Sequence, residues 1–127
     1  MSHFSRIKTI IKDLDLLKQT LNDLSIEWKD GASEIRGYRN QKYKADLVIN
    51  QSNNIDIGFC WNNNSYELTA DIAFWDQPVS IDRYLNKINH RYAFNKILEQ
   101  TTKSGFELVN QNSNIDGSTT IVLEKWN

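Results

Sequence analysis

The chain has 127 residues, of which 39% are hydrophobic, with four Trp, five Tyr and five Phe. This length and composition are typical of a single globular domain that buries its own core. Fifteen basic and sixteen acidic residues leave a net charge of -1. That balance argues against nucleic acid as a partner, because nucleic-acid-binding domains carry an excess of basic residues. The single cysteine, Cys60, excludes an intramolecular disulfide and a multi-cysteine metal site.

Uninterrupted apolar runs are short throughout the sequence, far below the roughly 20 residues that cross a bilayer. The opening segment MSHFSRIK also has neither the apolar stretch nor the small-residue cleavage site of a signal peptide. We therefore expect a soluble protein with no membrane insertion, which is neither secreted nor imported by a visible signal.

The N-terminal part predicts a strand followed by a helix. Residues 3–11 alternate imperfectly between apolar and polar side chains, which favours a first strand. Asp13 has the position of a helix cap, and the helix is expected to end near Ser25. Leucines at spacings of three, four and three residues form one apolar stripe along it: Leu14, Leu17, Leu21 and Leu24. A core-facing helix is favoured over one that binds in a partner's groove.

Three strand candidates occupy the middle of the chain, at residues 44–50, 55–61 and 66–75. They are separated by QSNN and NNNS, which are Asn/Ser clusters typical of turns. The three segments therefore predict an antiparallel meander. A weaker strand signal surrounds Ile35, after a turn at Asp30-Gly31.

The sequence after the meander predicts a long helix. Pro78 is expected to stop the third strand, and Ser80 to cap a helix that runs to the region of Lys103. Gly105 then closes the helix in the left-handed conformation that glycine adopts readily.

Two further strand candidates, FELVNQN and STTIVLEKW, flank Asp116-Gly117, a dipeptide typical of tight hairpins. The full order is strand, helix, antiparallel strands, helix and hairpin, without the alternation that builds a parallel doubly wound sheet. It predicts one α+β domain over residues 1–127. The sheet is expected to be largely antiparallel, with two main helices packed on one face.

Strand register follows from the turn lengths. A four-residue NNNS turn places Trp61 opposite Tyr66 on an apolar face, and Asp56 directly opposite Asp71 on the other face. Like charges that face each other across a sheet destabilise it unless a cation, a shared proton or a basic side chain relieves them.

A five-residue turn before the second strand of the meander would place Val48 beside Asp56, and Asp46 diagonal to Asp56. Asp46, Asp56 and Asp71 then form a candidate ligand or metal face, since adjacent carboxylates bind hard cations or act as an acid/base pair. The favoured alternative is a solvated face on which nearby basic residues neutralise these acids. Those basic residues are Arg36, Lys42 and Lys44.

Trp61, Trp75 and Trp126 fall near strand ends, where large rings either complete the core or anchor a partner. The chain has no phosphate-binding glycine loop, zinc-binding helix motif or nucleophile elbow. We therefore predict no catalytic residue and no cofactor, and the sequence leans against an enzyme.

Several segments together resemble one family of small proteins. They are MSHFSRIK, DLDLLKQTLNDL, RGY, KADLVI, IDIGF followed by WN, YELTADIAFWDQP, YLNKINHRYAF, and the Trp next to the C-terminus. In this order they are similar to the hypothetical chloroplast reading frame thirty-five family of algal plastids and cyanobacteria. The resemblance covers essentially the whole chain. It implies a protein encoded in the plastid and located in the stroma, and it brings no catalytic residue with it.

Two functions from different classes fit these observations. The first is a non-enzymatic stromal accessory or protein-interaction domain that binds a protein partner or itself. The alternative is a small-ligand or metal-binding protein that uses the carboxylates of the sheet face.

Overall fold

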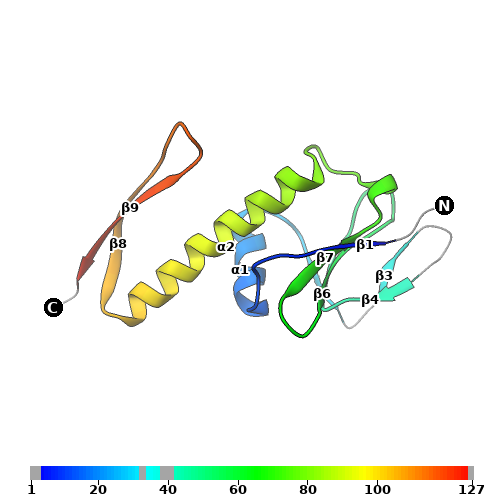
Figure 1. Ribbon diagram of the computed structural model, residues 1–127, viewed down its shortest axis with the longest axis horizontal. Coiled ribbons are helices and arrows are strands. Elements are labelled where there is room, and N and C mark those ends of the chain that lie inside the picture. Colours follow the sequence, from blue (N-terminus) through cyan, green and yellow to red (C-terminus); the bar gives the residue numbers. More distant parts are fainter. Residues whose placement is uncertain (1–3, 32–33, 38–41, 126–127) are drawn as a thin grey trace. The chain divides into compact units, whose positions relative to one another are not determined.

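The computed structural model describes residues 4–31, 34–37 and 42–125. The chain divides into two compact units, Met1–Tyr92 and Ala93–Asn127, with the boundary inside the second helix (Figure 1). The single domain over 1–127 stays a prediction, and each unit is described separately below.

The elements follow the predicted order, and the α+β class is confirmed. Along the chain they are β1 (Ser5–Ile7), α1 (Leu14–Asp23), β2 (Lys29–Asp30), β3 (Glu34–Arg36), β4 (Lys42–Lys44), β5 (Leu47–Ile49), β6 (Ile57–Trp61), β7 (Tyr66–Ala70), a 3-10 helix (Ile72–Phe74), α2 (Ile81–Lys103), β8 (Phe106–Ser113) and β9 (Thr119–Lys125). Among the described residues, no helix is long and apolar enough to span a membrane.

The first unit is built on a five-stranded sheet in the order β1-β7-β6-β5-β2, and all its strand pairs are antiparallel. One row across the sheet aligns Leu47, Phe59 and Leu68, and all three side chains are fully buried. The next row aligns Val48, Gly58 and Thr69. Because successive strand residues point to opposite faces, the first row marks the core face.

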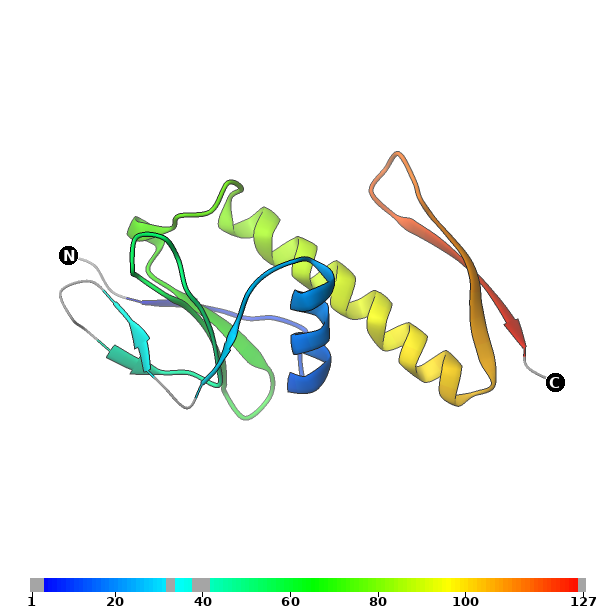
Figure 2. The same cartoon turned by 180° about the vertical axis from the view of Figure 1, so that it is seen from behind.

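Helix α1 lies beside the sheet (Figure 2), and its leucines join the buried residues of the core face in one cluster. Asp13 caps it as predicted, since its Oδ1 accepts a hydrogen bond from the Leu16 N–H at 3.1 Å. Leu17 and Leu21 are completely buried. Ser25 follows with a positive φ of 58°, and this left-handed residue ends the helix.

The N-terminal part of α2 packs on the same core. Ser80 caps the helix as predicted, accepting from the Arg83 N–H at 3.2 Å. The buried side chains on this stretch are Tyr84, Leu85, Ile88 and Tyr92. The Tyr92 hydroxyl accepts hydrogen bonds from the N–H groups of Lys12 and Asp13 at 3.2 and 3.1 Å. The helix therefore holds the start of α1 in place, and both helices share one face of the sheet.

The third strand of the meander is shorter than the predicted segment 66–75. Strand β7 ends at Ala70 and a 3-10 helix follows at once. The physical reason is Asp71, whose Oδ1 accepts from the Ala73 N–H at 3.1 Å and caps the 3-10 turn. A side chain that bonds its own backbone two residues on competes with continued strand pairing.

Gly31 lies where the chain leaves β2, and its N–H donates to the Asp46 carbonyl at 3.1 Å. A Cβ at Gly31 would lie 1.8 Å from the Ala45 carbonyl oxygen and 2.4 Å from the Asp46 carbonyl carbon. We expect Gly31→Ala to lower the free energy of unfolding by about 1–3 kcal/mol, because backbone atoms have to move apart. Urea denaturation measures the loss, and an unchanged free energy would show that the two segments do not approach so closely.

The second unit holds the C-terminal hairpin. Strands β8 and β9 form a two-stranded antiparallel sheet, and Gly117 has the positive φ of 87° that the predicted turn needs. Gly105, with φ of 88°, ends α2 in the predicted left-handed conformation. The pairing shifts at Val109, which has no partner in β9 between Leu108 and Asn110.

Candidate functional site

The three aspartates of the predicted ligand face lie at different structural positions. The register of β6 with β7 is confirmed, with Trp61 opposite Tyr66. The register of β5 with β6 is wrong by two residues, because Val48 pairs with Gly58 and not with Asp56. The strands are joined by residues 50–56, a longer connection than the five-residue turn that the prediction assumed.

The longer connection has a physical cause in the buried side chain of Gln51. Its Nε2 donates to the Ile55 carbonyl and its Oε1 accepts from the Asp76 N–H, both at 2.8 Å. Asn53 adds a bond from its Nδ2 to the Phe74 carbonyl at 2.8 Å. These bonds tie the connection to the segment after β7, and a tight turn would leave Gln51 buried without partners.

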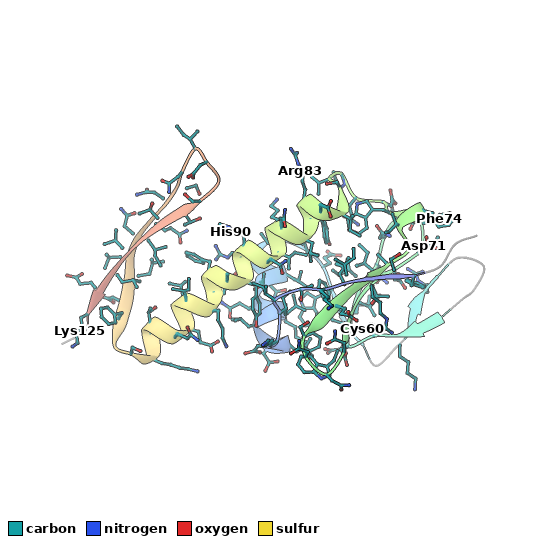
Figure 3. All side chains as sticks on the ribbon, in the orientation of Figure 1. Cys60, Asp71, Phe74, Arg83, His90 and Lys125 are labelled. Atoms are coloured by element: carbon teal, nitrogen blue, oxygen red, sulfur yellow. The ribbon has the colours of Figure 1, made fainter. Side chains whose placement is uncertain are left out.

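Asp46 lies directly before β5, and it bonds to the backbone of β6. Its Oδ2 accepts from the Trp61 N–H at 2.8 Å, and its own N–H donates to the Phe59 carbonyl at 2.9 Å. Asp71 caps the 3-10 helix and lies at the end of β7, where Figure 3 shows it beside Phe74. Both carboxylates therefore have local backbone partners.

Asp56 forms a buried ion pair with Arg36. Its side chain is 2% exposed and that of Arg36 is 44% exposed, with the closest contact at 2.8 Å from Nη2 to Oδ1. The Arg36 Nε and backbone N–H and the Asn50 Nδ2 also donate to this carboxylate. Burial alone would raise the pKa of Asp56, but these hydrogen bonds and the Arg36 charge outweigh it and hold the pKa below its ordinary value.

The structure thus does not bring the three carboxylates together. The described residues contain no group of three or more His, Cys, Asp or Glu side chains that would hold a metal ion. Of the favoured alternative, the structure contains the ion pair of Asp56 with Arg36, but the Asp56 side chain is only 2% exposed, so its carboxylate does not lie on a solvated face. The ligand or metal role of Asp46, Asp56 and Asp71 stays a prediction without such a cluster behind it.

The candidate tryptophans have different surroundings. Trp61 is 43% exposed and lies against Tyr66, with ring centroids 4.9 Å apart. Trp75 packs against the core, stacks edge-on to Tyr84 and donates from Nε1 to the Val79 carbonyl at 2.8 Å. Trp126 lies outside the described residues. Of the two candidate tryptophans that the structure describes, Trp61 is therefore the more accessible one.

Cys60 is a structural thiol. It is buried in β6, where its Sγ lies 3.4 Å from the Lys44 carbonyl and accepts from the Thr69 hydroxyl at 3.4 Å. Burial raises its pKa above the ordinary value, so the reactive thiolate is disfavoured. Figure 3 shows Cys60 on the sheet and His90 on α2, in separate elements.

The hairpin β8–β9 is exposed along most of its length. Several of its large apolar side chains are exposed to solvent: Leu108, Val109, Ile115 and Val122. On β9, Ile121 and Leu123 are half-buried while Val122 and Glu124 are exposed, so one face of the hairpin is partly covered and the other is open. The sequence predicted the hairpin but not that its apolar side chains would be accessible.

The open face carries two carboxylates directly opposite each other, Glu107 and Glu124. Both are exposed, and neither forms an ion pair within the described part of the chain. Such a pair costs some tenths of a kcal/mol up to about 1 kcal/mol on a sheet. A basic group brought between them would remove this cost.

The first unit also contains a cleft of about 420 Å³ beside the edge strand β2. The described residues that line it are Asn22, Glu27, Trp28, Lys29 and Asn50. Lys18 lies over the Trp28 ring at 5.2 Å and pairs with Asp30 at 2.8 Å, which holds the indole in position. The Asp30 carboxylate raises the pKa of Lys18. The sequence alone did not indicate this cleft.

Comparisons with known proteins agree with the resemblance seen in the sequence. The family described as "Protein of unknown function (DUF1257)" matches residues 20–122. "Uncharacterized protein ycf35" of Guillardia theta is 49% identical over 99% of this chain and 98% of its own length. The protein of the same description from Pyropia yezoensis is 44% identical over 100% of this chain and 99% of its own length.

A third protein of that description, from Cyanophora paradoxa, is 36% identical over 99% of this chain and 98% of its own length. No solved structure gives a significant match. These relatives are encoded in algal plastid genomes, which confirms the predicted plastid location and organelle coding. Since the family matches most of the chain and the relatives cover nearly all of it, the chain belongs to the DUF1257 family, together with the ycf35 proteins of algal plastids.

Proposed function

We propose that this chain is a non-enzymatic accessory protein of the stroma, and that the hairpin β8–β9 is its binding element for another protein. The observation that carries the proposal is a two-stranded sheet whose apolar side chains Val109 and Val122 remain 47% and 46% exposed. A lone hairpin is only marginally stable in water, and exposed apolar groups on a sheet mark interaction sites.

The edges of the hairpin offer a way to bind. Strands β8 and β9 pair only with each other among the described residues, so each has an outer edge with unpaired backbone groups. Proteins usually protect such edges, because an extended segment of another chain adds to them as a further strand. The bulge at Val109 shifts the pairing without covering the edge.

Charge defines the chemistry of the partner. The hairpin carries Glu107, Asp116 and Glu124 against a single basic residue, Lys125. The opposed pair Glu107 and Glu124 favours a Lys or Arg side chain placed beside it. We therefore expect a partner protein that supplies an extended segment with apolar side chains for Val109 and Val122 and a basic residue for the two glutamates.

The test compares capture by the full chain and by two double variants. Val109→Asp with Val122→Asp is expected to abolish capture of the partner from a Guillardia theta plastid extract, because it places carboxylates on the apolar surface. Glu107→Gln with Glu124→Gln is expected to weaken capture and its salt dependence. The control is Ile72→Asp, a change at an exposed apolar residue outside the hairpin, which is expected to capture as well as the unaltered chain.

The size of the purified chain in solution separates a partner from self-association. We expect a monomer by light scattering at all concentrations. A dimer that the double aspartate variant dissociates would identify a second copy as the occupant and overturn the proposal of another protein. Equal capture by the hairpin variants and by the unaltered chain would also contradict it.

A further inference from the structure

The backbone groups of the hairpin β8–β9 alternate between its interior and its two outer edges. Next to the turn, the Asn114 N–H donates to the Ser118 carbonyl at 2.8 Å, so these two residues form a hydrogen-bonded pair. In an antiparallel ladder such pairs alternate with pairs whose backbone groups point outward. The third pair from it, Gln111 with Ile121, therefore directs its N–H and C=O groups away from the hairpin. Among the described residues, no further strand pairs with these groups.

The two outer edges differ in regularity. On β9 the outward residues follow at every second position, as Ile121 and Leu123 do, because each residue of the strand has a partner in β8. On β8 the extra residue Val109 breaks this spacing between Gln111 and Leu108. An incoming regular strand bonds through every second residue. It can therefore pair along all of β9 but along only part of β8.

The side chains of the two strands also differ. Residues 110–113 of β8 are Asn, Gln, Asn and Ser, whereas β9 contains an apolar run made of Ile121, Val122 and Leu123. Glu124 follows this run and stands opposite Glu107. A partner strand gains more from β9, because it buries apolar side chains there and places a basic group beside the two carboxylates.

A second copy of the chain fits this edge less well than another protein. If two β9 strands pair antiparallel with their apolar residues aligned, Val122 faces its own copy and Glu124 faces Thr120. The opposed carboxylates Glu107 and Glu124 then keep their mutual repulsion in both copies. A lysine or arginine opposite Glu124 removes this repulsion, and in this register only a different sequence supplies one.

We propose that the partner protein of the hairpin adds an extended segment antiparallel to the outer edge of β9. From its N-terminal end, this segment carries a basic residue opposite Glu124 and a polar residue opposite Thr120. Between them it carries apolar residues opposite Leu123, Val122 and Ile121. Antiparallel pairing is slightly more stable per residue than parallel pairing, which sets the direction. The inference rests on the proposed function, to which it adds the edge, the direction and the side-chain pattern of the partner.

A fluorescein-labelled peptide, Ser-Glu-Lys-Val-Ile-Val-Thr-Ser, tests this pattern by fluorescence anisotropy with the full chain. It is expected to bind at least roughly threefold more tightly than a peptide of the same residues in reverse order, whose Lys faces Thr120 when the apolar residues are aligned. Glu107→Gln with Glu124→Gln is expected to remove this preference. Absence of binding by the first peptide overturns the inference, as does tighter binding of the reversed one.

Two proline variants at opposed positions of the hairpin assign the edge. Ile121→Pro removes an outward N–H from β9 and Gln111→Pro removes one from β8, so each leaves the hydrogen bonds within the hairpin in place. Ile121→Pro is expected to weaken binding of the first peptide at least about tenfold, and Gln111→Pro less than about twofold. Ile121→Ala, which keeps the N–H, is expected to lie between them. Equal weakening by both prolines, or a larger effect of Gln111→Pro, would overturn the assignment to β9.

Capture from the plastid extract separates this inference from the proposed function. If Val109→Asp with Val122→Asp abolishes capture but the peptide or proline results differ from those expected, the hairpin remains the binding element and only the assignment to the β9 edge is wrong. If that double variant captures as well as the unaltered chain, the proposed function is wrong and so is the inference that rests on it.

Discussion

Arg36→Met is expected to destabilise the protein more than Asp56→Asn, although both changes break the same ion pair. The Asp56 side chain is 2% exposed, whereas that of Arg36 is 44% exposed. Removing the arginine leaves a buried carboxylate without its cation, which typically costs about 3–5 kcal/mol. Removing the charge of Asp56 lets the arginine return to water, and the new amide oxygen still accepts from the Arg36 N–H. We expect about 1–3 kcal/mol for this change.

The ion pair also predicts a pH dependence. The folded-state pKa of Asp56 lies below its ordinary value, so the folded state binds its proton more weakly than the unfolded state. The stabilisation is complete above the unfolded-state pKa of about 3.9 and is lost as the pH falls through the lower folded-state pKa. The difference in stability between the unaltered chain and Asp56→Asn should therefore be largest near neutral pH and shrink in acid.

Urea denaturation at about pH 7 and about pH 3 measures both effects. The matched control is Asp23→Asn, which breaks the more exposed pair with Arg91 at 3.2 Å and is expected to cost less than about 1 kcal/mol. Equal losses for Arg36→Met and Asp56→Asn would contradict the asymmetry. A difference between the unaltered chain and Asp56→Asn that grows in acid would contradict the direction of the pKa shift.

Phe59→Ala is the second change with a large expected effect. Phe59 is fully buried in β6, between Leu47 and Leu68 of the neighbouring strands. Truncating it removes apolar contacts and leaves a cavity between the sheet and the two helices. We expect a loss of about 3–5 kcal/mol in the free energy of unfolding, enough to unfold a domain of ordinary stability.

Because Phe59→Ala itself risks complete unfolding, Phe59→Leu gives a graded measurement. It is expected to cost roughly 1–2 kcal/mol, since most of the apolar volume remains. Ile72→Ala serves as the control, because Ile72 is 53% exposed and surface changes usually stay within about 0.5 kcal/mol. Similar losses for Phe59→Leu and Ile72→Ala would place Phe59 outside the core.

The elements that sequence reasoning predicted well are those with local signals. Caps at Asp13 and Ser80, the left-handed Gly105 and the Asp116-Gly117 hairpin depend on residues close together in the chain. The register of β6 with β7 was also correct, because the NNNS turn is short and sets the pairing on both sides.

Errors arose where a long-range contact decides the local structure. The β5–β6 connection is lengthened by Gln51, whose partners lie as far away as Asp76, and the predicted diagonal of Asp46 and Asp56 is lost with it. Strand β7 ends early because Asp71 caps a new turn. The alternation of apolar residues alone contains neither signal, since it continues through residues 66–75.

The candidate sites also depend on contacts between residues that lie far apart in the sequence. The Arg36–Asp56 pair was one of the predicted alternatives, but its burial and its extra partner Asn50 are visible only in the fold. In the cleft, Glu27 and Lys29 are near neighbours in sequence, whereas Asn50 comes from a different strand end. In the sequence, Trp28 stands between Glu27 and Lys29. A tryptophan between two opposite charges is also common at protein surfaces, so this pattern does not indicate a cleft.

The hairpin β8–β9 is, in our proposal, the element that binds another protein. A photo-crosslinking residue at position 122 in the full chain tests it most directly in a Guillardia theta plastid extract, with position 72 as the matched exposed control. The proposal predicts a discrete adduct with a different protein from position 122, lost when Glu107 and Glu124 are both changed to Lys, and no such adduct from position 72. The same adducts from both positions, or adducts of the chain only with itself, would contradict it.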